Sequence, residues 1–257
     1  MQDKYSGDVG DFGNLVLLRQ VASMKHHILR LGINWYRVTL PEASNSDGRH
    51  IAYLDPRNPA ALSFRARDPR TWDGLKTIVQ NNKRSIRALE ESRLLPPDTI
   101  YFPEPVPFGA PSPKRRMAGR NRWFLDSLGK LAPADVAFLD PDNGIQPASV
   151  KLTQTRVVKY ALENEIRAYT HNHDLVIVYH HRDRTPLHRY KRRFARLRDR
   201  LGHPACMGVL HFGRYSAREY VFFFRKPLAR LVAELFGRLT APPLHFLFTE
   251  ISVEGDA

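Results

Sequence analysis

The sequence predicts one α/β domain over residues 1–257, a three-layer sandwich whose mostly parallel sheet ends in an antiparallel C-terminal strand pair. Apolar segments of strand length alternate with segments of helical spacing, which is typical of a sheet covered by helices. The segment "DLVIVYHH" at 174–181 is nearly all apolar, as a strand buried on both faces should be. Two late apolar segments, 206–212 and 220–225, are joined by a short link, which favours antiparallel pairing.

Each helix and strand is predicted from the spacing of its apolar residues and from the capping or turn-forming residues at its ends. Residues 14–31 have apolar side chains at helical spacing, with Asn14 as the expected N-cap and Gly32 as the stop. The Pro-rich and basic residues 105–117 predict an exposed loop. The expected strands lie at 33–40, 49–55, 99–105, 135–140, 174–181, 206–212, 220–225 and 244–251. Further helices are expected within 69–93 and near 119–131, 157–169, 186–202 and 227–239. Strands separated by helices require crossovers, so this order predicts a Rossmann-like sheet.

The amino-acid composition limits which kinds of function the protein can have. The formal net charge is +14 and the pI is near 10.1, which favours a polyanionic partner such as RNA or DNA. The helix expected at 186–202 has an apolar stripe and an Arg-rich outer face, and we interpret that face as a solvated surface rather than as a dedicated nucleic-acid contact. No apolar run suits a membrane span, and the N-terminal residues do not resemble a secretory signal, so we expect no membrane partner and a cytoplasmic location. Cys206 is the single cysteine, which excludes a multi-cysteine zinc site.

Polar residues follow two apolar strands where ligands bind in α/β sheets. The stretch "VAFLDPDNG" ends in Asp140, Pro141, Asp142, Asn143 and Gly144. Asp, Asn, Pro and Gly also form ordinary surface turns, so a plain turn is the alternative. The second stretch ends in Tyr179, His180 and His181, and histidine suits proton transfer near neutral pH. We therefore expect a site at the carboxyl edge of the sheet.

These motifs resemble the class I S-adenosylmethionine (SAM)-dependent methyltransferases, and most closely the family that methylates adenine N6 in large-subunit ribosomal RNA. In that family a strand ends in an Asp-Pro-Pro-Tyr motif, a second strand closes in an aromatic residue, and a Gly-Asn-type segment leads into the first helix. "FLDPDNG", "LVIVYHH" and "GDVGDFGNLVLLR" are similar to these three features. Asp142 and Asn143 replace the second proline and the aromatic residue, and a single glycine, Gly48, lies in the expected cofactor loop.

The resemblance implies methylation of an adenine N6 amine in RNA or DNA with SAM as cofactor. It implies that Asp140 accepts a hydrogen bond from the target amine, that Pro141 or Asn143 orients it, and that a ring stacks on the base. The implied catalytic residues are Asp140, Pro141, Asp142, Asn143, Tyr179 and His180. The implied cofactor-binding residues are Asp11, Phe12, Tyr36, Asp47 and Gly48.

Two other functions stay open. If the N-terminal segment folds over the edge of the sheet, Asp8, Asp11, Asp140 and Asp142 could supply oxygen ligands for Mg²⁺ or Mn²⁺. With His180, His181 or Lys159 nearby, such a centre would suit a nuclease or phosphoesterase. The third function is nucleic-acid binding without catalysis, which the poverty of glycine in the cofactor loop favours.

Overall fold

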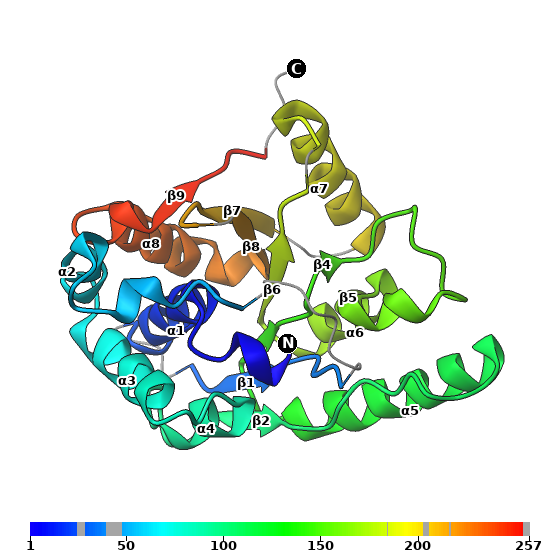
Figure 1. Cartoon of the computed structure of the whole chain (residues 1–257). Helices are drawn as coiled ribbons and strands as arrows, with labels where there is room; N and C mark the ends of the chain where they lie inside the picture. The colour runs from blue at the N-terminus through cyan, green and yellow to red at the C-terminus, as the bar shows by residue number, and fades with distance from the viewer. Residues whose placement is uncertain (25–28, 40–47, 184, 203–205, 216, 254–257) are drawn as a thin grey trace.

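The computed structural model describes residues 1–24, 29–39, 48–183, 185–202, 206–215 and 217–253. These residues form a Rossmann-like α/β fold built on a seven-stranded sheet with the order β2-β1-β3-β6-β8-β7-β9 (Figure 1). The strands are β1 (Leu31–Asn34), β2 (Ile100–Phe102), β3 (Val136–Leu139), β6 (Leu175–His181), β7 (Cys206–Phe212), β8 (Arg218–Phe224) and β9 (Phe248–Glu250). The fold class predicted from the sequence is therefore confirmed.

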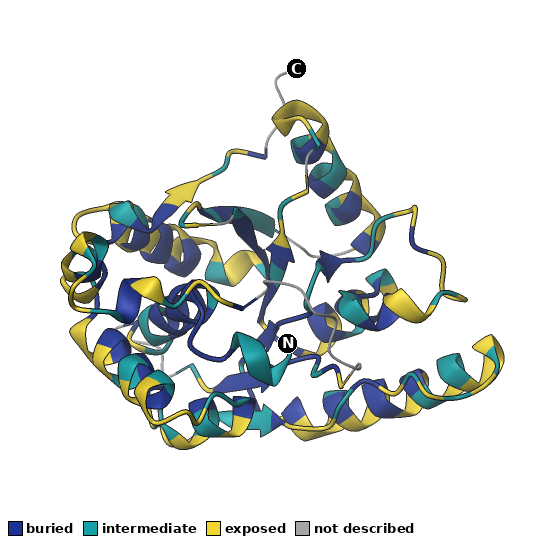
Figure 2. Cartoon of the chain, in the orientation of Figure 1, coloured by how far each residue is buried: buried dark blue, intermediate teal, exposed yellow. Residues whose placement is uncertain are grey.

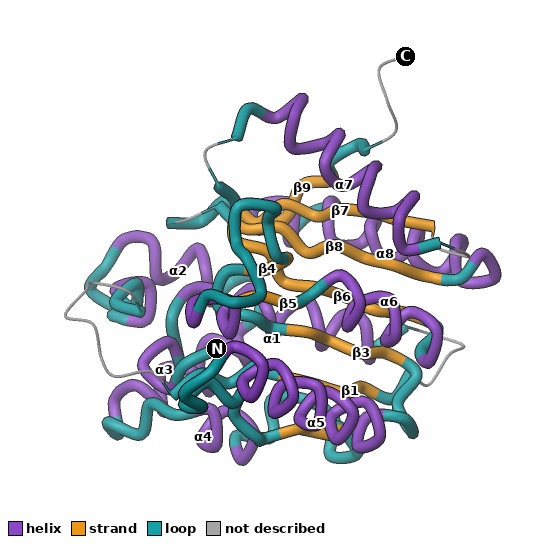
Figure 3. The backbone as a smooth tube through the Cα atoms, turned by 90° about the vertical axis from the view of Figure 1, so that its right-hand side faces the viewer, coloured by secondary structure: helices purple, strands orange, loops and turns teal. Residues whose placement is uncertain are grey.

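Strand direction divides the sheet into two parts. β2, β1, β3 and β6 pair in parallel, so their carboxyl ends meet at one edge. β8 pairs antiparallel with both β6 and β7, and β9 pairs antiparallel with β7. Figure 3 shows the strands one above another in this order. The predicted C-terminal antiparallel pair is β7 and β8, which the short link at 213–217 joins.

Helices cover both faces of the sheet, and Figure 1 places them in two groups. On one face lie α1 (Val9–Ala22), α2 (Pro59–Arg65), α3 (Pro69–Gln80), α4 (Ile86–Glu91) and α8 (Ala229–Thr240). On the other lie α5 (Pro113–Leu131), α6 (Glu163–Asn172) and α7 (Leu187–Leu201). A small parallel pair, β4 (Gly144–Ile145) with β5 (Tyr160–Ala161), stands beside the main sheet. Among the helices of the described ranges, none is both long enough and apolar enough to cross a membrane.

Alternation along the strands separates two hydrophobic cores. In β6, Ile177 joins the core under α1 and α8, while Val176 and Val178 join the core under α5, α6 and α7. Successive side chains of a strand point to opposite faces, so a strand covered on both faces is apolar throughout. Figure 2 shows the central strands in the buried colour and the outer helix faces exposed.

Several predicted elements differ from the observed ones. Residues 49–55 do not form a strand, because Leu54 and Asp55 donate backbone hydrogen bonds to Ile51 and Ala52 and close the short 3₁₀ helix Ala52–Leu54. The helix predicted to begin at Asn14 begins at Val9 with Asp8 as its N-cap, and Asn14 lies buried inside it.

Three boundaries in the middle and C-terminal parts also differ. α5 begins inside the predicted loop, because Ser112 caps it and Pro113 occupies its first turn. Residues 155–159 form a 3₁₀ helix, and the predicted helix near 157–169 begins only at Glu163. The last strand, β9, covers three residues, because 244–246 form a 3₁₀ turn.

A buried ion pair ties α5 to α6 beneath the sheet. The Arg120 guanidinium donates to both carboxylate oxygens of Glu165, at 2.6 and 2.9 Å, and both side chains are 2% exposed. Glu165 also accepts from the Leu162 amide at the start of α6 and from the Tyr36 hydroxyl. Because each charge has several partners, the pair fixes how the two helices meet.

Replacing Glu165 with alanine should reduce the free energy of unfolding by about 3–5 kcal/mol, because it leaves the Arg120 charge buried without its counter-ion. Glu163→Ala is the matched control, since Glu163 is in the same helical turn but pairs with Arg167 and Arg200 at the surface. That control should change stability by about 1 kcal/mol or less. Urea unfolding of both variants measures the difference, and equal losses would contradict the role of the buried pair.

Candidate active site at the carboxyl edge of the sheet

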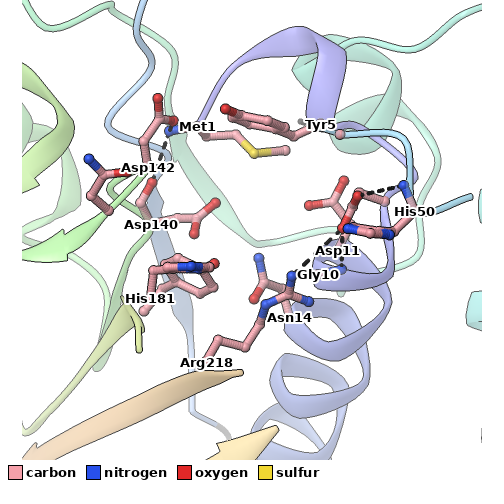
Figure 4. Close-up of a pocket in the computed structure, with 14 residues that line it drawn as sticks. Met1, Tyr5, Gly10, Asp11, Asn14, His50, Asp140, Asp142, His181 and Arg218 are labelled. Carbon is pink, nitrogen blue, oxygen red and sulfur yellow. Dashed lines mark hydrogen bonds and ion pairs between the residues drawn. The ribbon is translucent and has the colours of Figure 1, made fainter. Parts of the chain in front are cut away.

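A cavity of about 340 Å³ opens beyond the carboxyl ends of β3 and β6. Its walls come from segments far apart in the sequence: the N-terminal residues, the start of α1, residues 48–50, the loop after β3, the end of β6 and the start of β8. Figure 4 shows Asp140 and Asp142 on one side of the cavity and Asp11 and His50 on the other. The N-terminal segment therefore reaches the edge of the sheet, as the metal hypothesis requires.

The loop after β3 supplies two carboxylates in different electrostatic states. Asp140 is 4% exposed, and burial together with the charge of Asp142 raises its pKa to about 7. Burial alone would also raise the pKa of Asp142, but an ion pair with the Met1 amino group at 2.7 Å and a hydrogen bond from Gln2 at 2.5 Å outweigh it. The pKa of Asp142 therefore lies below its usual range, so this carboxylate is charged while Asp140 exchanges a proton near neutral pH.

The start of α1 supplies the opposite wall. Asp8 caps the helix by accepting from the Gly10 amide at 2.9 Å, and it also accepts from the His50 amide at 3.1 Å. Asp11 accepts from the Gly7 amide at 2.8 Å. Burial and the charge of Asp140 raise the pKa of Asp11 well above its usual value. Asp11 and Asp140 thus oppose each other's ionisation across the cavity.

The three polar residues at the end of β6 point to opposite faces of the sheet. Tyr179 and His181 line the cavity, whereas His180 lies on the opposite face of the sheet against Tyr190 and Phe194 of α7. Burial, followed by the charge of Arg193, lowers the pKa of His180 to about 3, so its imidazole is neutral. The sequence predicted both Tyr179 and His180 as catalytic residues. Strand alternation places Tyr179 at the cavity together with His181, and it places His180 on the opposite face.

Gly144 allows the loop after β3 to pass against His180. The glycine has a φ of +93°, and a side chain at this position would overlap the His180 ring and approach its Cα to 2.6 Å. The amide of the next residue, Ile145, donates to Nδ1 of His180 at 2.9 Å. The glycine of "DPDNG" is therefore required by both conformation and space.

The structure brings together most of the predicted site residues. Asp8, Asp11, Gly48, Asp140, Asp142, Asn143 and Tyr179 line the cavity. The carbonyl of Pro141 accepts from the Gly144 amide within the turn, Phe12 packs against Tyr53 and Phe64, and Tyr36 lies in the core beside Trp123. Lys159 lies 3.8 Å from Asp142, and Asp47 falls outside the described residues.

Several lining residues were not expected from the sequence. Tyr5, Gly10 and Asn14 come from the N-terminal segment and α1, and His50 follows residue Gly48. Arg218 is 5% exposed and lies 3.8 Å from Asp8, at the first position of β8. Arg218 lies opposite His181 because β6 and β8 pair antiparallel. The sequence predicted an antiparallel strand here but not which residues would face each other.

Comparison of the chain with protein-family models, curated proteins and solved structures gave no match. The chemistry of the cavity must therefore be argued from its own residues.

The described residues do not form a glycine-rich cofactor cradle after β1. Residues 35–39 contain no glycine, and Tyr36 makes the turn with a φ of 44° while its hydroxyl bonds Glu165 in the core. Most of the expected cofactor loop, residues 40–47, lies outside the described part. Within the described part, no group of three or more His, Cys, Asp or Glu side chains is arranged to hold a metal ion.

Gly144→Ala should reduce the free energy of unfolding by more than about 2 kcal/mol, because it adds positive-φ strain to an overlap with His180. Gly129→Ala is the matched control, since Gly129 lies within α5 with open space around its Cα. Alanine there should stabilise by about 0.5–1 kcal/mol. Chemical denaturation compares the two, and a neutral Gly144→Ala would contradict the packing of the loop on His180.

Asp140→Asn should stabilise the protein above pH 7 and have little effect near pH 4. The folded-state pKa of about 7 exceeds the unfolded value of about 3.9, so the wild type loses stability as pH rises between these values. The neutral amide removes that loss. Asp142→Asn should do the reverse and destabilise at neutral pH, because the folded state lowers the pKa of Asp142. Thermal unfolding at pH 5 and pH 8 tests both signs, and a pH-independent Asp140→Asn effect would contradict the assignment.

Proposed function

We propose that this chain is an enzyme that modifies nucleic acid at the exocyclic amine of a base, namely adenine N6 in RNA or DNA, with SAM as the methyl donor. The observation that carries the proposal is the buried carboxylate of Asp140. It follows the central strand β3, in a short Asp-Pro turn, and faces a cavity large enough for a base. The antiparallel strand β8 next to β6 agrees with the fold that the methyltransferase resemblance implies.

The cavity has acceptors suited to an amine. An ionised carboxylate offers only acceptors, and an exocyclic amine offers two N–H donors. Asp140 supplies the acceptor, and the Asn143 amide, which also lines the cavity, can both donate and accept at the ring edge. The Pro141 carbonyl already accepts from Gly144, so we assign the orienting role to Asn143.

An aromatic side chain is present for stacking although the motif lacks one. Tyr179 lines the cavity from the end of β6. Tyr5 borders the cavity from the N-terminal segment (Figure 4). A base stacked on either ring must be single-stranded or flipped out of a helix. Burial raises the pKa of Tyr179 to about 12, so its hydroxyl stays protonated and neutral.

The proton balance at the amine assigns a second role to Asp140. SAM, when bound, would supply an electrophilic methyl group, and the amine that accepts this group would have to release a proton. With a pKa of about 7, Asp140 is close to the value at which a carboxylate accepts a proton at neutral pH and releases it again. Burial keeps the pKa of Asp140 high and the charge of Asp142 adds to this, while the Met1 amino group acts in the opposite direction.

Asp140→Ala should abolish transfer of labelled methyl groups from SAM to RNA or DNA, because it removes both the acceptor assigned to the amine and the group assigned to take its proton. Asp140→Asn keeps an acceptor oxygen and should retain measurable activity, at a level reduced by about 10²–10⁴-fold if proton transfer is lost. Asp126→Asn, an exposed carboxylate on α5, is the control and should be fully active. Calorimetry with SAM is the companion measurement. Full activity of Asp140→Ala, or no heat on adding SAM, would contradict the proposal.

A metal-dependent nuclease is the second candidate because four aspartates line one cavity, although within the described residues no three of these side chains are arranged to hold a metal ion. Asp8 and Asp11 share the cavity with Asp140 and Asp142. Such a centre predicts cleavage that needs Mg²⁺ or Mn²⁺ and stops on chelation. Asp140→Asn separates the two candidates, because an amide is a poorer ligand for a divalent cation than a carboxylate and would abolish cleavage. Cleavage of nucleic acid that continues in the presence of EDTA would exclude a metal-dependent nuclease.

A further inference from the structure

A second concave surface, the α7 groove, lies between α7 and the loop after β4. One wall is formed by Arg189, Arg192, Arg193, Arg196 and Arg200, and the other by residues 146–148. The groove has a volume of about 470 Å³, and among the residues that the structure describes no Asp or Glu lines it. Five guanidinium groups thus face one recess without a carboxylate among its lining residues.

Protein stability does not account for this arrangement of charge. Tyr190, Phe194, Leu197 and Leu201 bury the opposite face of α7, so the fold needs only those residues from the helix. Like charges three and four residues apart disfavour a helix. Arg189 also lies in the first turn, where the helix dipole disfavours a cation.

Only two of the five arginines have carboxylate partners in the described part of the chain. Arg193 pairs with Asp183 at 2.7 Å, and Arg200 pairs with Glu163 at 2.9 Å. Within the described residues, Arg189, Arg192 and Arg196 are exposed and have no ion pair or side-chain hydrogen bond. Their guanidinium groups remain available to a ligand.

We infer that the α7 groove binds the phosphate backbone of a single-stranded nucleic acid. The planar guanidinium fork matches phosphate oxygens, and a cationic groove that follows a backbone is how proteins hold single strands. From Arg189 to Arg200 the helix rises about 16 Å, so the row of guanidinium groups is long enough to contact several successive phosphates of a single strand. The choice of nucleic acid as partner rests on the proposed function.

The α7 groove and the cavity are joined by a short, fixed segment. Asn143 lines the cavity and Gln146 lines the groove, so only Gly144 and Ile145, which form β4, separate them. His180 holds this segment through the Ile145 amide, and Arg193 of the groove lies 2.8 Å from the other ring nitrogen. A strand seated on α7 would therefore present a neighbouring base to the loop that carries Asp140.

The test compares two triple variants of the full chain. Arg189→Gln, Arg192→Gln and Arg196→Gln remove three charges from the groove and keep good helix formers. Lys83→Gln, Arg87→Gln and Arg230→Gln remove three exposed charges near α4 and on α8, on the other side of the sheet. Fluorescence anisotropy with labelled 12-nucleotide single-stranded RNA and DNA, each measured over a range of salt concentrations, gives the affinity and its salt dependence.

We expect the groove variant to bind on the order of a hundredfold more weakly at 0.1 M salt, because three phosphate contacts contribute about 0.7 each to the slope of log affinity against log salt. That slope should fall by about two, and the control variant should match the wild type. Unchanged affinity and slope in the groove variant would overturn the inference, as would equal losses in both variants. Displacement of the RNA by polyglutamate as effectively as by unlabelled RNA would also overturn it.

The experiments distinguish a wrong inference about the α7 groove from a wrong proposal of methyl transfer. Tight RNA binding that depends on the α7 arginines, in a protein that gives no heat with SAM, would support the groove and contradict methyl transfer. Methyl transfer by a groove variant that binds RNA like the wild type would support the function and overturn the groove. A wild type that binds neither RNA nor DNA overturns the groove outright.

Discussion

The burial of β3 and β6 on both faces is the constraint on which the rest of the structure depends. A strand with helices on both sides must be apolar at every position, so it can carry polar side chains only where it leaves the core. For β3 that point is Asp140, and for β6 it is Tyr179. Because β3 and β6 are parallel, both strands leave the core at the same edge of the sheet. The cavity forms at this edge.

Some carboxylates of the cavity lie beside a cationic group, whereas others are buried in positions that oppose their ionisation. Asp142 and Asp8 have cationic neighbours in Met1 and Arg218, whereas Asp11 and Asp140 face each other. The protein therefore holds a carboxyl group of raised pKa beside one of lowered pKa at the same strand end. Pairs of this kind, separated by their environments, are the usual basis of acid–base chemistry in enzymes.

The sequence predicted the sheet and the edge where the site lies, because those depend on apolar runs and element order. It missed Arg218 and His50, since these reach the cavity through β-strand register and a loop that has no periodic pattern. Alternation along β6 could have assigned His181 rather than His180 to the cavity, because Ile177 and Tyr179 already define that face. The resemblance implied that Phe12 and Tyr36 bind the cofactor, but aromatic side chains near a site belong as readily to the core, where both of these lie.

The contact between Gly144 and His180 has a consequence for recognising related chains. The two residues are thirty-six positions apart but depend on each other. A side chain at 144 would meet the backbone Cα of residue 180 whatever side chain residue 180 has, and the φ at 144 stays positive. Residue 180 in turn supplies the acceptor for the Ile145 amide. The motif that marks this architecture is therefore a pair, an Asp-Pro turn that ends in glycine and a histidine at the end of the next long strand. A chain that keeps the aspartates but lacks this pair would have to route its loop differently and would present its carboxylates to a differently shaped cavity.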